Sequence, residues 1–127
     1  MHILRTAFLA LIIILLFFKP SYSQQQDNYL AYAQVMPKPV GGMAAIYKNL
    51  TYPESAREAH LEGKVYLLVC VNSNGGIDDV SIIKGLGMGC DQAAEKAIKS
   101  VAFTPGENKG KNVNVKLAIS VTFQLNN

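Results

Sequence analysis

Residues 113–125 follow a strict alternation that limits the chain to few folds. Every odd-numbered residue from Val113 to Leu125 is apolar, and every even-numbered one is polar or is alanine. Period two predicts a long β-strand with one buried and one solvated face, whereas a helix would scatter the apolar residues around its circumference. Such a strand needs a neighbouring strand and a second layer over its apolar face.

A β-hairpin supplies the neighbouring strands. Lys64–Val71 and Ile77–Lys84 are rich in β-branched residues, and the polar segment Asn72–Gly76 separates them. The Asn-Gly pair within that segment provides the positive φ angles that a tight hairpin turn requires. Lys64–Val71 is apolar at successive positions, which predicts a central strand covered on one face and partly covered on the other.

Three segments are predicted to be helical: Gly42–Leu50, Pro53–His60 and Asp91–Val101. In the last of these, apolar residues recur at i, i+3, i+4 and i+7 from Ala94. Asp91 is the expected N-cap of that helix, where its negative charge is favourable. The order helix, helix, strand, strand, helix, strand predicts an α+β fold of two layers: a three-stranded antiparallel sheet with helices packed on one face.

The N-terminal segment is typical of export. Ala7–Phe18 is an unbroken apolar run that follows Arg5, and a helix of its 12 residues would cover about 18 Å. A hydrocarbon core is about 30 Å thick, so the run is short for a membrane span. We expect residues 1–23 to be a signal peptide, cut after Ser23 to leave Gln24 as the first residue. A short uncleaved anchor remains the alternative.

The remaining chain predicts one domain with little net charge. Cleavage removes Arg5 and Lys19 from the 12 basic residues and none of the 9 acidic ones, so the net charge falls to +1. A nucleic-acid-binding domain would show a clustered basic excess, so we expect no nucleic-acid partner. We expect a flexible lead over 24–40, which could span at most about 60 Å, and a folded domain over 41–127.

The sequence shows no pattern for catalysis, a metal or a cofactor. His60 is the only histidine after the signal segment, and no nucleophile motif accompanies it. Cys70, Cys90 and His60 lack the spacing of metal ligands. An exported chain with two cysteines permits a disulfide, and a Cys70–Cys90 bridge would stabilise the fold by about 3 kcal/mol. Two free thiols are the other interpretation, and both stay open.

An ordered set of short motifs carries a family resemblance. These are Tyr52–Arg57, Gly63–Val65, Asn74-Gly75, Asp91–Ala94 with Ala97, Phe103–Pro105, Gly110–Val113 and Val121–Leu125. No single motif is specific, but the set in this order resembles the C-terminal domain of TonB, the periplasmic arm of an energy transducer. Met36–Met43 also resembles a Pro-Gly-Gly lead found in part of that family. The resemblance covers about 90 residues.

The resemblance implies a peptide-binding edge on the last strand. In the family, an extended peptide from an outer-membrane transporter adds beside this strand, and main-chain hydrogen bonds provide the affinity. The matching edge residues here are Asn112, Val113, Asn114, Val115, Lys116, Leu117, Ala118 and Ile119. By position alone, the turn Lys48, Asn49, Leu50 and Thr51 would lie near the peptide. The alternative is an edge that only resists aggregation, a role that Lys116 also fits.

Other features of the family are absent from the sequence. The membrane helix of a TonB transducer carries a histidine that couples it to the ExbB–ExbD complex, and Ala7–Phe18 has none. The 24–40 lead is also much shorter than the family's proline-rich linker. We therefore do not expect coupling to ExbB–ExbD. The sequence leaves open a transport-linked domain and a stand-alone periplasmic interaction module. It also leaves open a cleaved periplasmic or an anchored inner-membrane state, and a strand-exchanged homodimer.

Overall fold

The computed structural model describes residues 28–126, so the expected signal peptide and the start of the lead lie outside it. The elements, in chain order, are β1 (Lys38–Pro39), α2 (Met43–Lys48), α3 (Glu54–Glu58), β2 (Gly63–Val71), β3 (Ile77–Lys84), α4 (Cys90–Lys99), β4 (Phe103–Thr104), β5 (Gly106–Asn108), β6 (Lys111–Val113) and β7 (Val115–Phe123). The three predicted helices and three long strands appear in the predicted order.

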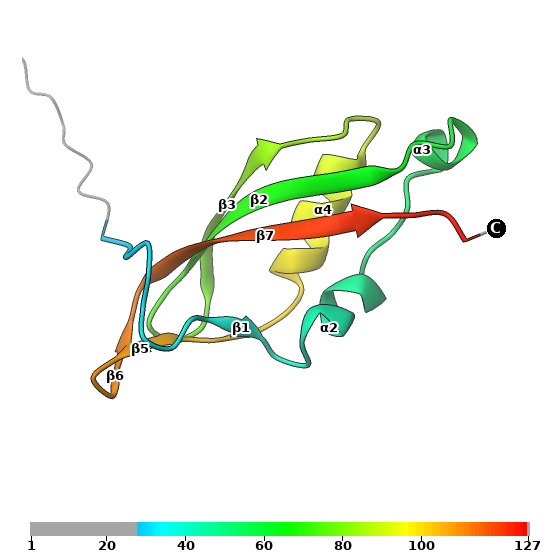
Figure 1. Cartoon of the computed structure of the whole chain (residues 1–127). Coiled ribbons are helices and arrows are strands. Elements are labelled where there is room, and N and C mark those ends of the chain that lie inside the picture. The colour runs from blue at the N-terminus through cyan, green and yellow to red at the C-terminus, as the bar shows by residue number, and fades with distance from the viewer. Residues whose placement is uncertain (1–27, 127) are drawn as a thin grey trace, which may run out of the picture.

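The main sheet has three antiparallel strands in the order β3-β2-β7 (Figure 1). β2 is central, as its apolar sequence predicts, and its pairing with β7 runs without a break from Gly63↔Phe123 to Val71↔Val115. The pairing of β2 with β3 is antiparallel but contains two register shifts. Two short antiparallel pairs, β1 with β4 and β5 with β6, extend the fold at one end.

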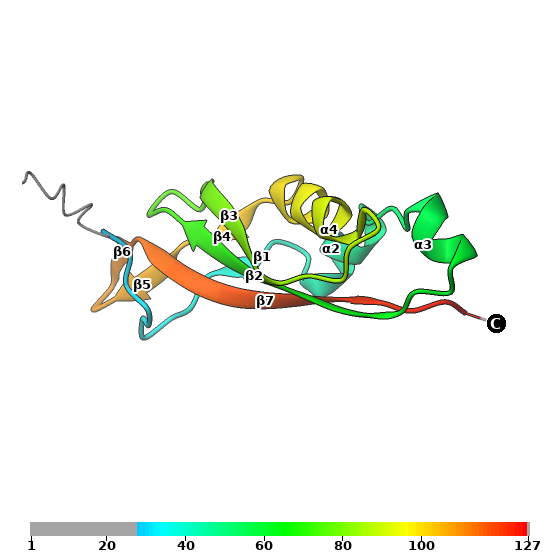
Figure 2. The same cartoon turned by 90° about the horizontal axis from the view of Figure 1, so that it is seen from above.

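All three helices lie on one side of the main sheet, which gives the predicted two layers (Figure 2). The odd-numbered residues of β2 and β7 face the helices. Fully or almost fully buried there are Val65, Leu67, Val69, Val71, Ile119, Val121 and Phe123. Ile98 of α4, Ile46 of α2 and Ala56 of α3 are fully buried against them. Burying each large aliphatic side chain contributes about 1.5–3 kcal/mol, so this interface supplies most of the stability.

Asp91 does not have its predicted role as an N-cap. Helix α4 begins at Cys90, and its N-cap is Gly89 with a φ of +85°. Asp91 lies in the first turn, and its Oδ1 accepts hydrogen bonds from the N–H groups of Leu86 (2.8 Å) and Gly87 (3.4 Å). The carboxylate therefore holds the glycine-rich loop against the start of the helix, where its charge is still favourable.

The long predicted strand is divided into two at Asn114. Residues 111–113 form β6, which pairs with β5 through a turn at Lys109 and Gly110, both with positive φ. β7 then begins at Val115 and joins the main sheet. The Oδ1 of Asn114 accepts the N–H of Ser73 at 2.8 Å, which ties the break to the β2–β3 turn. The alternation over 113–125 predicts β7, but it predicts neither the interruption at Asn114 nor β6.

Residues 28–40 lie against the domain, although the sequence suggests a flexible lead. Leu30 forms a parallel bridge with the first residue of β7, Val35 forms an antiparallel bridge with β5, and β1 pairs with β4. Ala33 is only 1% exposed. Backbone pairing and the burial of small residues hold this segment in place. The domain boundary at residue 41 stays a prediction.

The two cysteines are free thiols, and their positions explain why no bridge joins them. Cys90 is fully buried at the start of α4. Val69 and Val71 of β2 are buried on the helix side, so Cys70 between them points to the opposite face of the sheet. The suggested Cys70–Cys90 disulfide is therefore wrong for this fold.

Candidate functional site: the outer edge of strand β7

β7 is an edge strand of the main sheet, and two hydrogen bonds define its outward-facing groups. The N–H of Lys116 donates to the carbonyl of Leu30 at 2.9 Å, and the N–H of Thr122 donates to the hydroxyl of Tyr47 at 3.0 Å. Both bonds lie on the side of β7 away from β2. Backbone groups along a strand alternate in direction, so Ala118 and Ser120 also present their N–H and C=O groups outward.

The stretch between these two bonds is open. Within residues 28–126, the outward N–H groups of Ala118 and Ser120 have no hydrogen-bond partner, and on the side of β7 away from β2 the only strand-type pairing is the bridge at Leu30. Leu30 and Tyr47 therefore mark its two ends. A row of unpaired backbone donors and acceptors is a template for another extended chain.

The face of the sheet away from the helices provides the side-chain surroundings of this edge. Ala118 lies opposite Leu68 of β2, and Ser120 lies opposite Tyr66. Tyr66 is 39% exposed, so its ring is available to a side chain beside the edge. Below the edge, Ile119 is buried against the helices. An added strand would alternate its own side chains between these two environments.

The predicted edge residues fall into three groups. Asn112 and Val113 belong to β6 and lie off the main sheet. The next segment, 114–116, pairs with Leu30 through the Asn114 carbonyl and the Lys116 N–H. Only 117–119 lies on the open stretch, which continues through Ser120. The prediction therefore began too early, because the alternation gives no sign of the break at Asn114 or of the pairing with the lead.

The predicted near-site turn lies beside α4. Asn49 and Thr51 line a hollow of about 270 Å³ together with Gln92 and Lys96 of that helix. Among the described residues, no hydrogen bond joins the 48–51 turn to β7. The residue before the turn, Tyr47, makes that contact instead. The sequence places Tyr47 on the inward stripe of its helix. Its one sequence signal for an edge role is its residue type, because a tyrosine combines an apolar ring with a hydroxyl that seeks a hydrogen-bond partner.

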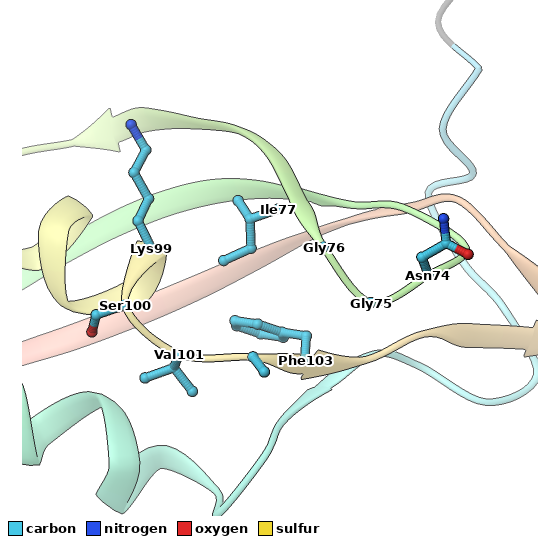
Figure 3. Close-up of a pocket in the computed structure, with 9 residues that line it drawn as sticks. Asn74, Gly75, Gly76, Ile77, Lys99, Ser100, Val101 and Phe103 are labelled. Carbon is cyan, nitrogen blue, oxygen red and sulfur yellow. The ribbon is translucent and has the colours of Figure 1, made fainter.

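A second hollow, of about 580 Å³, lies between the β2–β3 turn and the end of α4 (Figure 3). Its lining is mainly glycine backbone and apolar side chains such as Ile77 and Phe103. Lys99 is its one charged residue and pairs with Glu95 at 2.8 Å. Within residues 28–126, no three His, Cys, Asp or Glu side chains gather as metal ligands.

A polar contact near the start of β7 fixes the lead. The hydroxyl of Tyr29 donates to Asp78, and the Nδ2 of Asn72 donates to the Oδ1 of Asp78 at 2.8 Å. The Tyr29 bond, followed by the Asn72 bond, lowers the pKa of the Asp78 carboxyl. The same bond to Asp78 raises the pKa of Tyr29 to about 12. Tyr29 is therefore a neutral donor and Asp78 a charged acceptor near neutral pH.

Comparison with known proteins identifies the family of the chain. The family described as Gram-negative bacterial TonB protein C-terminal matches residues 48–125. The chain belongs to this family. The solution structure of the Pseudomonas aeruginosa TonB C-terminal domain is similar at a TM-score of 0.51 and 25% identity, covering 61% of this chain and 80% of that one. The chain therefore has the fold of this family.

Two Helicobacter pylori structures are further matches to this TonB C-terminal domain. Residues 194–285 match at a TM-score of 0.46 and 28% identity, with 61% of this chain and 85% of that one covered. Residues 179–285 match at 0.47 and 26%, with coverage of 66% and 78%. Comparison with curated proteins gave no significant match. TonB C-terminal domains lie in the periplasm and are non-catalytic. No helix in residues 28–126 is long and apolar enough to cross a membrane.

Proposed function

We propose that this domain captures an extended peptide of an outer-membrane transporter by strand addition along the outer edge of β7. The open stretch of that edge, between Lys116 and Thr122, carries the proposal. Ala118 and Ser120 offer two outward N–H groups at the spacing of an antiparallel or parallel partner strand. Membership of the TonB family supports a transporter as the source of the peptide. Main-chain bonds would provide affinity, and alternate side chains would provide specificity.

The physical state of the edge favours binding over simple protection. Ala118 is exposed and small, so it leaves the backbone accessible. Protected edges usually carry a charge, a proline or a bulge at such a position, and residues 117–121 contain none of these. Lys116 lies at the end of the stretch, so it leaves the middle of the edge uncovered.

Ser120→Pro tests the proposal because proline removes one outward N–H and leaves the bonds between β7 and β2 intact. Ser120→Ala is the matched control, since it changes the side chain and keeps the donor. The probes are synthetic peptides that copy the N-terminal segments of outer-membrane transporters from the same bacterium. Loss of one net hydrogen bond should weaken binding about 2- to 12-fold in Ser120→Pro. Equal affinity of a folded Ser120→Pro variant and the control would contradict strand addition here.

A stand-alone periplasmic interaction module without an energy-transducing role is the second candidate. One observation favours it: the apolar run Ala7–Phe18 lacks the histidine through which a TonB membrane helix couples to ExbB–ExbD. We propose that residues 1–23 are a signal peptide, which would release the domain into the periplasm. Mass spectrometry of the envelope protein would then find Gln24 at its N-terminus. An intact N-terminus would instead support an inner-membrane anchor.

A further inference from the structure

The first described residues occupy part of the edge that the proposed function needs. The N–H of Leu30 donates to the carbonyl of Asn114 at 2.9 Å, and the carbonyl of Leu30 accepts the N–H of Lys116 at 2.9 Å. These two bonds make a one-residue parallel bridge at the start of β7. The segment therefore pairs with the outer edge of β7 in the way that an added strand from another molecule would.

Little apolar burial holds this segment in place. Leu30 is 43% exposed and Tyr32 is 73% exposed, while Asn28 and Ala31 are also exposed. The contacts of the segment include the two backbone bonds and a hydrogen bond from the Tyr29 hydroxyl to Asp78. Segments with few buried apolar contacts and exposed hydrogen bonds open locally at low cost. Asn28–Tyr32 should therefore detach far more easily than β7 can leave β2.

The residues that follow are held firmly and would limit the opening. Ala33 is 1% exposed, and Val35 exchanges two backbone hydrogen bonds with Glu107, at 2.9 and 3.0 Å. Gln34 adds bonds to Asn108 and Lys109, both at 2.8 Å. Detachment would therefore stop at Ala33. The family match covers residues 48–125, so residues 28–35 lie outside the matched part, whereas their partners on β5 and β7 lie inside it.

We propose that Asn28–Tyr32 is a displaceable strap that competes with an incoming peptide for the first part of the β7 edge. This inference rests on the proposed function, because it describes the regulation of the same site. With the strap closed, a peptide can reach the outward N–H groups of Ala118 and Ser120. Displacing the strap adds the Lys116 N–H and the Asn114 carbonyl. A peptide long enough to use them must therefore remove the strap first.

Hydrogen exchange of single amides measures whether the strap opens by itself. Two hydrogen bonds should protect the Lys116 amide only about 5- to 150-fold. The Leu117 amide, which faces β2, should be protected more than about 1,000-fold because it exchanges only when the sheet opens. Protection of Lys116 equal to that of Leu117 would show that the segment is a permanent part of the fold, which would overturn the proposal.

Two proline variants test whether the hydrogen bonds of Leu30 protect the Lys116 amide from exchange. Leu30→Pro removes the N–H that bonds to Asn114, so the Lys116 amide should lose its protection while Leu117 stays protected. Ala31→Pro is the matched control, because the Ala31 N–H has no hydrogen-bond partner in the part of the chain described, and it should leave both amides as they are. Tyr29→Phe removes only the hydroxyl that contacts Asp78, and it should give intermediate protection. Wild-type protection of Lys116 in Leu30→Pro would overturn the proposal.

A synthetic peptide copying residues 28–35 tests the competition in the full-length chain. It should shift the Lys116 amide resonance of Leu30→Pro and bind that variant about tenfold more tightly than wild type, whose own strap competes. If the peptide does not bind Leu30→Pro, the proposal that Asn28–Tyr32 is a displaceable strap is overturned. That result is separate from the proposed function, which is contradicted when transporter peptides leave Ala118 and Ser120 unprotected.

Discussion

Gly75→Ala probes the docking of the β2–β3 turn on the segment after α4. Gly75 has a φ of +82°, and its carbonyl accepts the N–H of Phe103 at 3.3 Å. A methyl carbon at this position would lie 2.1 Å from the carbonyl oxygen of Phe103. The oxygen belongs to the backbone, so the clash can be relieved only by moving the turn or Phe103, which is 4% exposed.

The expected loss combines two effects. The left-handed conformation costs an alanine about 1–2 kcal/mol, and forcing a well-packed region apart costs about 1–3 kcal/mol more. Gly75→Ala should therefore lower the free energy of unfolding by about 2–5 kcal/mol. Gly110→Ala is the matched control: Gly110 has a φ of +74° but nothing within 4 Å of the added methyl carbon, so only the conformational cost applies.

Urea denaturation at equilibrium measures both variants, and the slope with denaturant should stay unchanged. The difference between the two losses isolates the steric contribution of the Gly75–Phe103 contact. Equal losses in Gly75→Ala and Gly110→Ala would refute the reasoning, because they would show that the turn does not pack against Phe103.

Three further predictions follow from the core, the lead and the thiols. Phe123→Ala should lower the free energy of unfolding by about 3–5 kcal/mol in the same urea assay, since Phe123 is 1% exposed. The pKa of Asp78 is lowered in the folded state. Its contact with Tyr29 therefore stabilises the strap at pH values above the pKa that this carboxyl has in the unfolded chain. The stabilisation is lost as pH falls through the lower pKa that the carboxyl has in the folded chain. The raised pKa of Tyr29 keeps the contact until pH rises through about 12, so Tyr29→Phe should remove the pH dependence of strap opening seen by amide exchange. Thiol titration of the unfolded, unreduced protein should find Cys70 and Cys90 both free.

The sequence predicted the main sheet and its helical layer because both depend on side-chain periodicity. The 113–125 alternation and the apolar β2 segment required one buried sheet face, and the stripe from Ala94 supplied its cover. The same periodicity places Cys70 opposite the helix side, so the alternation itself argues against the suggested disulfide. Local capping was less predictable: Asp91 has the chemistry of an N-cap, but its carboxylate binds the preceding loop instead.

The candidate site was only partly predictable because it depends on contacts between distant segments. Leu30 reaches Asn114 and Lys116 through backbone atoms, and backbone pairing leaves little trace in the amino-acid sequence. Tyr47 closes the other end through one hydroxyl. The strand that carries the site could be read from its pattern, but the length of open edge required the three-dimensional arrangement.

Amide hydrogen exchange with bound peptide tests strand addition at β7 most directly. A transporter-derived peptide that adds to the outer edge should slow exchange at Ala118 and Ser120, whose N–H groups point outward. Leu117 and Ile119, whose N–H groups face β2, should change little. This two-residue alternation is the expected signature of a new strand. Binding that leaves Ala118 and Ser120 unprotected, or that protects a different surface, would contradict the account.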